Sequence, residues 1–186
     1  AQDGKLLQGG LPYPFISKTS LPDYREFDDS RYFHSTAKLL PELGGQVTME
    51  DLVKPVTVTI RGRELKLGVL LCEDGWTENY HYNVPELLEK NGAQILCNLS
   101  CSPYTFHKNR KRHDLFVRQS RQGGIPLVYC NNVGIQNNGK DVFTYDGCSC
   151  MYDARGRMIT DSPAFQEDLL ISRWNPDTGE LQGERG

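Results

Sequence analysis

An alternation of short apolar runs with polar, helix-like segments in the middle of the chain constrains its fold most strongly. Residues 65–71, 93–97 and 125–130 have the length and apolar character of buried strands. Helix-like segments separate them, from Pro85 to Asn91 and from Tyr104 to Gln122. Strand–helix–strand–helix–strand followed by hairpins is typical of an α/β layered fold with a mixed sheet.

Short strands joined by turns are predicted on both sides of this alternation. Val56 to Ile60 and Glu64 to Leu71 form a predicted hairpin around Arg61-Gly62-Arg63. The first residues, up to Pro22, show weak periodicity, and a domain rarely begins with so long an irregular segment. We therefore expect the domain to begin upstream of Ala1. Four further strands are expected after the Asn137-Asn138-Gly139 turn, at residues 142–145, 148–152, 157–160 and 168–173.

Length and charge exclude several classes of protein. The 186 residues suffice for one domain, and 21 basic against 24 acidic residues give a net charge of -3, with no general attraction to nucleic acid. We expect the basic run 108–113 to be a solvated helix face. The sequence shows neither a membrane span nor a signal-peptide pattern, so a cytoplasmic location is expected.

The six cysteines lack the spacing of a metal site, because none forms a Cys-x-x-Cys pair and no His lies at zinc-ligand spacing from any pair. No metal is therefore predicted. Reduced and buried thiols are expected at the four cysteines within apolar runs, which are Cys97, Cys130, Cys148 and Cys150.

Cys72 directly follows the predicted strand 65–71 and is the first candidate for chemistry. A thiol at the carboxyl end of a buried strand can point into the crevice where open α/β sheets bind ligands, and Cys is a ready nucleophile at neutral pH. The turn that follows, residues 73–76, offers backbone N–H groups to a developing oxyanion. The alternative is a structural thiol, since free Cys is among the most often buried residue types.

Two further segments supply groups that a Cys nucleophile needs. Lys18 stands just before Leu21-Pro22-Asp23-Tyr24, and the polar segment 98–104 ends the strand that follows the nucleophile strand. Because the loops at the ends of adjacent strands converge on one crevice, we expect Ser100 and Ser102 to line the same pocket as Cys72.

These segments resemble the nitrilase superfamily of carbon-nitrogen hydrolases, which use a Glu-Lys-Cys triad. Residues 18–33 are similar to the family's lysine motif. Residues 68–76 are similar to the nucleophile motif of one branch, the glutaminase domains of glutamine-dependent NAD synthetases. The resemblance covers nearly the whole chain, because later segments recur in that branch in the same order: 131–134, 145–149, 153–157 and 163–169.

The resemblance implies an α/β fold, a four-layer α-β-β-α sandwich incomplete at its N-terminal side, with residues 1–186 as a partial glutamine amidohydrolase domain. It implies that Cys72 attacks the glutamine side-chain amide to give a thioester, with Lys18 beside it and Glu26 as an additional catalytic acid. Glu26 and Glu73 could instead be surface charges, and Trp76 part of the core. Four positions match residues that hold glutamine: Tyr24, Glu73, Trp76 and Ser100.

The sequence departs from the family at the triad's Glu. Only Asp3 precedes Lys18 as an acid, and its Asp-Gly-Lys turn matches no Glu motif; the pyrophosphate loop of the synthetase half is also missing. We therefore expect the upstream element with the catalytic Glu and the downstream synthetase domain to be absent. Without the general base, the chain alone is predicted to be inactive or unstable.

The resemblance also implies partners and cofactors. The glutaminase step would need no cofactor, whereas ATP, Mg and deamido-NAD would be used by a synthetase domain or subunit, and a homo-oligomer is expected. Two alternatives stay open: a nitrilase-type amidase or carbamoylase for another substrate, and an inactive nitrilase-like domain that acts in assembly.

Overall fold

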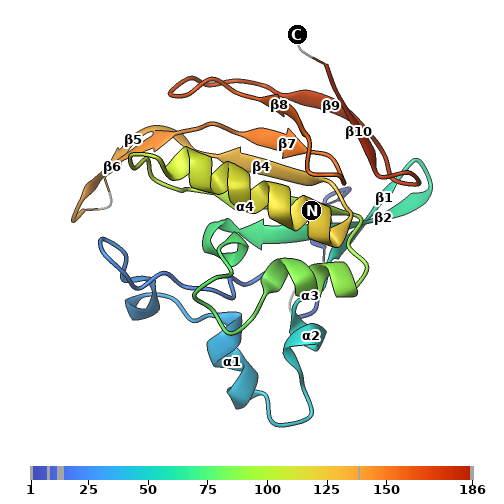
Figure 1. Ribbon diagram of the computed structural model, residues 1–186. Helices are drawn as coiled ribbons and strands as arrows, with labels where there is room; N and C mark the ends of the chain where they lie inside the picture. The colour runs from blue at the N-terminus through green and yellow to red at the C-terminus, as the bar shows by residue number, and fades with distance from the viewer. Residues whose placement is uncertain (1, 8, 12–14, 138, 185–186) are drawn as a thin grey trace. The chain divides into compact units, whose positions relative to one another are not determined.

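The computed structural model describes residues 2–7, 9–11, 15–137 and 139–184 (Figure 1). The chain divides into two compact units, Ala1–Gln94 and Ile95–Gly186. Each contains helices and strands, so the predicted α/β class is confirmed. None of the helices within the described ranges is long and apolar enough to cross a membrane.

The first unit is built on the predicted hairpin. Strands β1 (Val56–Ile60) and β2 (Arg63–Leu71) pair antiparallel, from Val56 opposite Leu67 to Ile60 opposite Arg63. Both turn residues have positive φ, 51° at Arg61 and 77° at Gly62. Such a turn suits a two-residue hairpin because its twist matches that of the flanking strands.

Short capped helices complete the first unit. The Asn83 side chain accepts from the backbone N–H of Glu86 at the start of α3, and Gly92 ends that helix at φ 85°. Thr48 and Asp51 form a capping box at α2. The helices are α1 (Thr36–Glu42), α2 (Met49–Leu52), α3 (Val84–Lys90), and the one-turn 3-10 helices η1 (Asp29–Arg31) and η2 (Cys72–Gly75). Their buried apolar side chains include Met49, Leu52, Val84 and Leu88.

The second unit contains the predicted mixed sheet. Strand β3 (Ile95–Ser100) pairs parallel with β4 (Leu127–Asn131), and the connection between them contains α4 (Lys108–Gly123). Strand β7 (Cys150–Tyr152) pairs antiparallel with β4, and β8 (Met158–Asp161) pairs with β7. The crossover from β3 to β4 through a helix is what the sequence predicted.

Two separate hairpins lie in the same unit. Strands β5 (Val133–Asn137) and β6 (Val142–Asp146) form one, and β9 (Ile171–Asn175) and β10 (Glu180–Glu184) form the other. Strands β5 and β10 were not predicted, and β9 begins three residues later than the predicted strand 168–173. Asn138 of the predicted turn lies outside the described residues.

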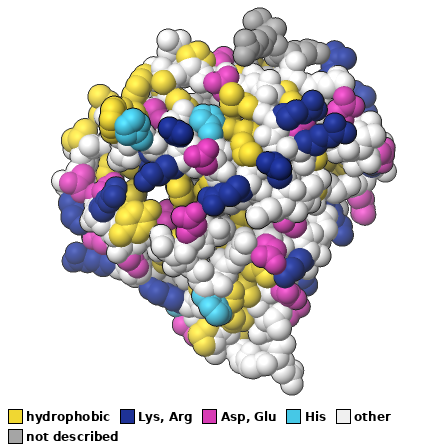
Figure 2. All heavy atoms as spheres, in the orientation of Figure 1, with side chains coloured by type: hydrophobic (Ala, Val, Ile, Leu, Met, Phe, Trp, Pro, Cys, Tyr) yellow, Lys and Arg dark blue, Asp and Glu magenta, His cyan; other side chains and the backbone are white. Residues whose placement is uncertain are grey.

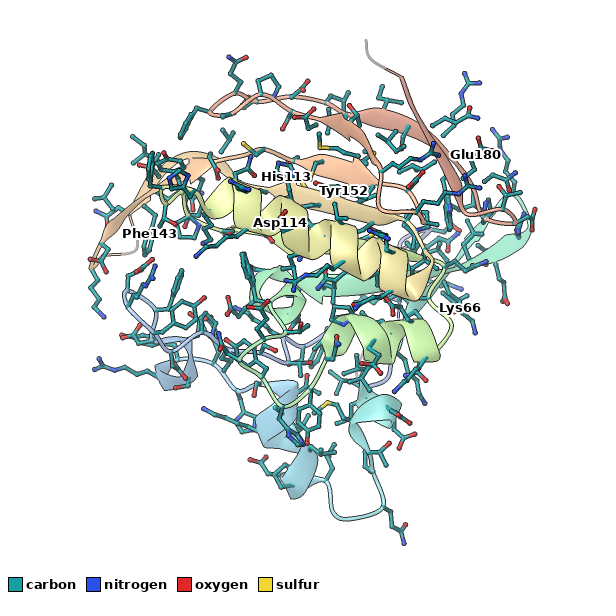
Figure 3. The ribbon with its side chains drawn as sticks, in the orientation of Figure 1. Lys66, His113, Asp114, Phe143, Tyr152 and Glu180 are labelled. Carbon is teal, nitrogen blue, oxygen red and sulfur yellow. The ribbon has the colours of Figure 1, made fainter. Side chains whose placement is uncertain are left out.

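Helix α4 packs on the mixed sheet through aromatic side chains. The Phe116 ring lies 4.6 Å from that of Tyr129 and 6.2 Å from that of Tyr152, between centroids. In Figure 3, His113 points from α4 toward Tyr152, and its Nδ1 contacts the tyrosine hydroxyl. Burial lowers the pKa of His113, so this ring is favoured in its neutral form.

Two predictions about burial were wrong at single residues. Arg112, within the basic run, is 1% exposed, because it is paired with Asp146 inside the second unit. Cys130 is exposed, whereas Cys148 and Cys150 are buried as predicted and Cys97 is partly buried. Basic and acidic side chains are interspersed on the face seen in Figure 2, in agreement with the balanced charge of the sequence.

Candidate active site

Cys72 occupies a sharp turn at the end of β2. It begins η2 and has φ 51°, in the left-handed region that non-glycine residues seldom adopt. Its side chain is partly exposed. Strained backbone of this kind often occurs at functional sites, because the surrounding structure must hold it in place. The geometry therefore agrees with a thiol presented by a strand-end turn.

Glu73 is buried in this turn beneath two tyrosine hydroxyls. Its side chain is 6% exposed and accepts hydrogen bonds from Tyr24 at 3.0 and 3.1 Å and from Tyr80 at 2.8 Å. The alternative of a solvated surface charge is thereby excluded for Glu73. Tyr80 was missed by the sequence analysis, since a lone tyrosine in a loop carries no recognisable signal.

The surroundings of Tyr24 and Tyr80 keep both hydroxyls protonated. Burial raises the pKa of each, and the Glu73 charge raises it further. For Tyr24, Cys72 and Glu26 add to this effect, which places both near that phenol. The two tyrosines are therefore hydrogen-bond donors to Glu73 throughout the neutral pH range.

Asp74, the next residue, joins the turn to the segment that follows Lys18. It is 3% exposed; its Oδ1 accepts from the backbone N–H groups of Thr19 at 2.9 Å and Ser20 at 2.8 Å. Its Oδ2 accepts from the backbone N–H of Leu71 at 3.2 Å. Burial raises the pKa of Asp74 to about 6, opposed by these backbone donors and by the Lys18 charge. The sequence analysis did not assign this residue a role.

Lys18 lies beside this junction and is paired with an acid. Its Nζ is 2.9 Å from Oδ2 of Asp29 in η1, and the two side chains are 24% and 23% exposed. The Lys18 carbonyl accepts from the backbone N–H of Thr36, the first residue of α1. Asp29 was not predicted as a partner, although it belongs to the same motif as Lys18.

The other predicted residues of the first unit surround the same turn. Tyr24 is partly exposed and packs edge-on against Phe27 at 5.7 Å between ring centroids. Glu26 is also partly exposed, as is Trp76, whose backbone N–H donates to the carbonyl of Glu73 at 2.8 Å. The first unit thus gathers six of the seven predicted site residues around one strand end and the segment joined to it.

The seventh, Ser100, belongs to the second unit. It ends β3, and its hydroxyl donates to Oδ1 of Asn98 at 2.8 Å. Its convergence with Cys72 stays a prediction, because the two residues belong to different units.

A buried polar network fixes the loop that follows Ser100. Arg112 Nη1 donates to both carboxylate oxygens of Asp146 at 2.8 Å, and Nη2 donates to the carbonyl of Ser102 at 3.0 Å. Asn131 donates to the same carbonyl at 3.2 Å and accepts from the Ser102 backbone N–H at 2.8 Å. A buried charge that is paired and hydrogen-bonded in this way holds its neighbours in one geometry.

The sequence profile of the carbon-nitrogen hydrolase family matches residues 17–181, so the chain belongs to this family.

Relatives and solved structures agree with this assignment. The chain is 32% identical over 187 residues to a glutamine-dependent NAD(+) synthetase of Synechocystis sp., matching 97% of this chain and 30% of that protein. For a synthetase of the same name from Thermotoga maritima, identity is 31% over 153 residues, with 82% of this chain and 22% of that protein covered. The chain therefore spans less than a third of the length of these relatives.

Two solved structures, a glutamine-dependent NAD+ synthetase and a carbon-nitrogen hydrolase, have a similar fold. A glutamine-dependent NAD+ synthetase from Acinetobacter baumannii aligns with TM-score 0.68 and 27% identity, over 91% of this chain and 27% of that one. A carbon-nitrogen hydrolase from Helicobacter pylori shares the fold with TM-score 0.60 at 21% identity, over 81% of this chain and 48% of that one. The predicted resemblance to the nitrilase superfamily is confirmed.

Proposed function

We propose that this domain hydrolyses the side-chain amide of glutamine through a thioester on Cys72. The thiolate attacks the amide carbon, and the C–N bond breaks as the nitrogen takes up a proton and leaves as ammonia. Water then attacks the thioester, which releases glutamate and restores the thiol. The observation that carries the proposal is the partly exposed Cys72 on a left-handed strand-end turn joined by hydrogen bonds to the lysine segment.

Cations and backbone donors would stabilise the charges that develop in these steps. Lys18 would favour the thiolate over the thiol and share the negative charge of the tetrahedral intermediate. The backbone N–H of Glu73, directly after the nucleophile, would be the second oxyanion donor. Glu26 would be an additional acid beside the triad. No residue of this sequence matches the family's general base, so the chain alone is still predicted to be inactive.

Glu73 is suited to hold the α-ammonium group of glutamine. An ionised carboxylate offers about four acceptor positions. The two tyrosine hydroxyls make three contacts of 2.8 to 3.1 Å with Glu73, two of them from the single Tyr24 hydroxyl. A carboxylate that faces the α-ammonium group of glutamine would form a charge-assisted hydrogen bond with it, with Tyr24 as a neighbouring contact. Trp76 and Ser100 are proposed as further contacts to the substrate.

The ammonia would serve NAD synthesis from deamido-NAD. This part of the proposal is supported by the names of the matching relatives, which are glutamine-dependent NAD synthetases. The glutaminase step would need no cofactor. A synthetase domain or subunit would use ATP and Mg, and we propose a homo-oligomeric assembly.

Azaserine, an electrophilic analogue of glutamine, tests the proposal on this chain. We expect mass spectrometry to find the adduct on Cys72 and glutamine to protect against it, while ammonia release from glutamine stays at background. Cys130→Ser, which removes an exposed thiol outside the site, is the matched control and should label normally. Absence of a Cys72 adduct from a chain whose Cys72 still reacts with iodoacetamide would contradict the glutaminase proposal. Protection by simple amides alone would favour another amidase, and robust ammonia release would show that no further Glu is required.

A further inference from the structure

We propose that Asp74 is a positioning residue, whose buried carboxylate holds the lysine segment against the turn that carries Cys72. This inference rests on the proposed function, since it assigns Lys18 and Cys72 to one reaction. Asp74 itself is too deeply buried to be a substrate contact, with 3% of its surface exposed.

The hydrogen bonds of Asp74 join two distant parts of the chain. Two of its donors, the N–H groups of Thr19 and Ser20, lie 55 and 54 residues earlier in the sequence. The third, the N–H of Leu71, belongs to the last residue of β2. One carboxylate therefore ties the residues directly after Lys18 to the residue directly before Cys72.

The arrangement requires a carboxylate. One oxygen receives two N–H groups and the other receives a third, so both must be acceptors. An asparagine could keep one side of this junction, but its NH₂ group is donor-only and would meet an N–H group on the other side. Asp74→Asn thus removes one of the two acceptor atoms and places a donor against a backbone N–H, which weakens the junction with almost no change in volume.

The junction also limits where the ammonium group of Lys18 can lie. The Lys18 carbonyl is held by the N–H of Thr36 at 3.0 Å, and the next residue by Asp74. The Nζ is held by Asp29 at 2.9 Å. Catalytic groups displaced by an ångström lose rate steeply, because the reaction depends on preorganised geometry. Asp74 would therefore act through Lys18 on the reactivity of the Cys72 thiol.

A double-mutant cycle tests this coupling. The wild-type chain, Lys18→Ala, Asp74→Asn and the double variant are alkylated with iodoacetamide at neutral pH, and the rate at Cys72 is followed by mass spectrometry. A nearby cation lowers a thiol pKa by about one unit or more, so we expect each single variant to react about tenfold more slowly. The double variant should react at most about twofold more slowly than either single variant, because both substitutions remove the same effect on the thiol.

Independent effects would overturn the inference. If the double variant reacts about a hundredfold more slowly, or if Asp74→Asn reacts at the wild-type rate, Asp74 does not act through Lys18. Asp51→Asn is the matched control, because this exposed carboxylate also accepts a backbone N–H, from Thr48 at 3.0 Å, in the same unit. Its Cys72 should react at the wild-type rate.

If Asp74→Asn does not fold, amide hydrogen exchange on the wild-type chain tests whether Asp74 holds the lysine segment. We expect the amides of Thr19 and Ser20 to exchange at least about tenfold more slowly than unprotected amides. Unprotected amides at Thr19 and Ser20 would overturn the inference. Iodoacetamide needs no recognition of glutamine, so a failure of azaserine labelling alone would contradict the proposed function and leave the coupling result intact.

Discussion

Two buried carboxylates, Asp74 in the first unit and Asp146 in the second, are stabilised in different ways. Asp146 receives two hydrogen bonds from the Arg112 guanidinium, so a full opposite charge lies beside it. The hydrogen bonds of Asp74 come from three backbone N–H groups, and burial raises its pKa to about 6. The Arg112–Asp146 ion pair thus fixes a loop in the second unit. In the first unit, the Asp74 carboxylate joins two segments of the proposed active site, although its charge is costly to bury.

The largest effect on stability is expected from breaking the Arg112–Asp146 ion pair. Arg112→Met should leave Asp146 buried and unpaired, and should lower the free energy of unfolding by about 3–5 kcal/mol. Chemical denaturation followed by circular dichroism measures this. Arg110→Met removes an exposed arginine from the same helix and should change stability by less than about 0.5 kcal/mol. Equal effects of the two variants would contradict the structural role of the pair.

The second-largest expected effect is the pH dependence of the stability that Asp74 contributes. Because the pKa in the folded chain is about 6, against 3.8 as the ordinary value, the folded state binds more protons between these values. Stability contributed by this group therefore falls as pH rises through this window. Relative to Asp74→Asn, the wild-type chain should lose up to about 3 kcal/mol between about pH 4 and about pH 7. Urea denaturation of both proteins at both pH values measures the change, and a difference that does not vary with pH would contradict it.

Glu73→Gln tests whether the buried acid beside Asp74 recognises substrate. A hydrogen bond to a charged group contributes about 1.5–3 kcal/mol. Its loss in this variant should therefore slow azaserine labelling of Cys72 by about 10- to 100-fold. Alkylation by iodoacetamide, which carries no ammonium group, should change far less. Glu78→Gln, an exposed acid in the following loop, is the control for both reagents. A parallel loss with both reagents would instead indicate a role in shaping the turn.

Asp29→Asn should have the smallest effect. Its ion pair with Lys18 is partly exposed, and such pairs are worth about 1 kcal/mol or less. We expect alkylation of Cys72 to slow by about two- to fivefold, because the ammonium group is less well oriented. Faster alkylation would mean that Asp29 competes with the thiolate for Lys18. Glu42→Gln, which removes another surface partner in the same unit, should leave the rate unchanged.

Local sequence signals predicted the parts of the fold that depend on neighbouring residues. The β1–β2 hairpin follows from its glycine-containing turn, and the β3–α4–β4 crossover from two apolar runs around a polar segment. The turn at Cys72 was predicted from its place after a strand. Helices α1 and α2 were missed, since they are short and α1 contains Pro41, which argues against a helix on sequence alone.

The rest of the site depends on contacts between distant residues. Asp74 accepts from backbone N–H groups more than fifty residues away, and such donors leave no mark on the side-chain sequence. Arg112 was predicted to be solvated because the run 108–113 is basic. Its ion-pair partner Asp146 lies 34 residues later in the sequence, so the pair is recognised only in the structure. A single sequence indicates a candidate nucleophile and its motif, but not which acids are buried beside it.

The left-handed backbone at Cys72 limits which nucleophiles this turn can carry. A β-branched side chain is a genuine outlier at positive φ, so a threonine here would add steric strain to the change in chemistry. Serine has no such branch and would meet no added backbone penalty. Any exchange of the proposed nucleophile in this scaffold, in nature or by design, is thus restricted by backbone conformation before reactivity is considered.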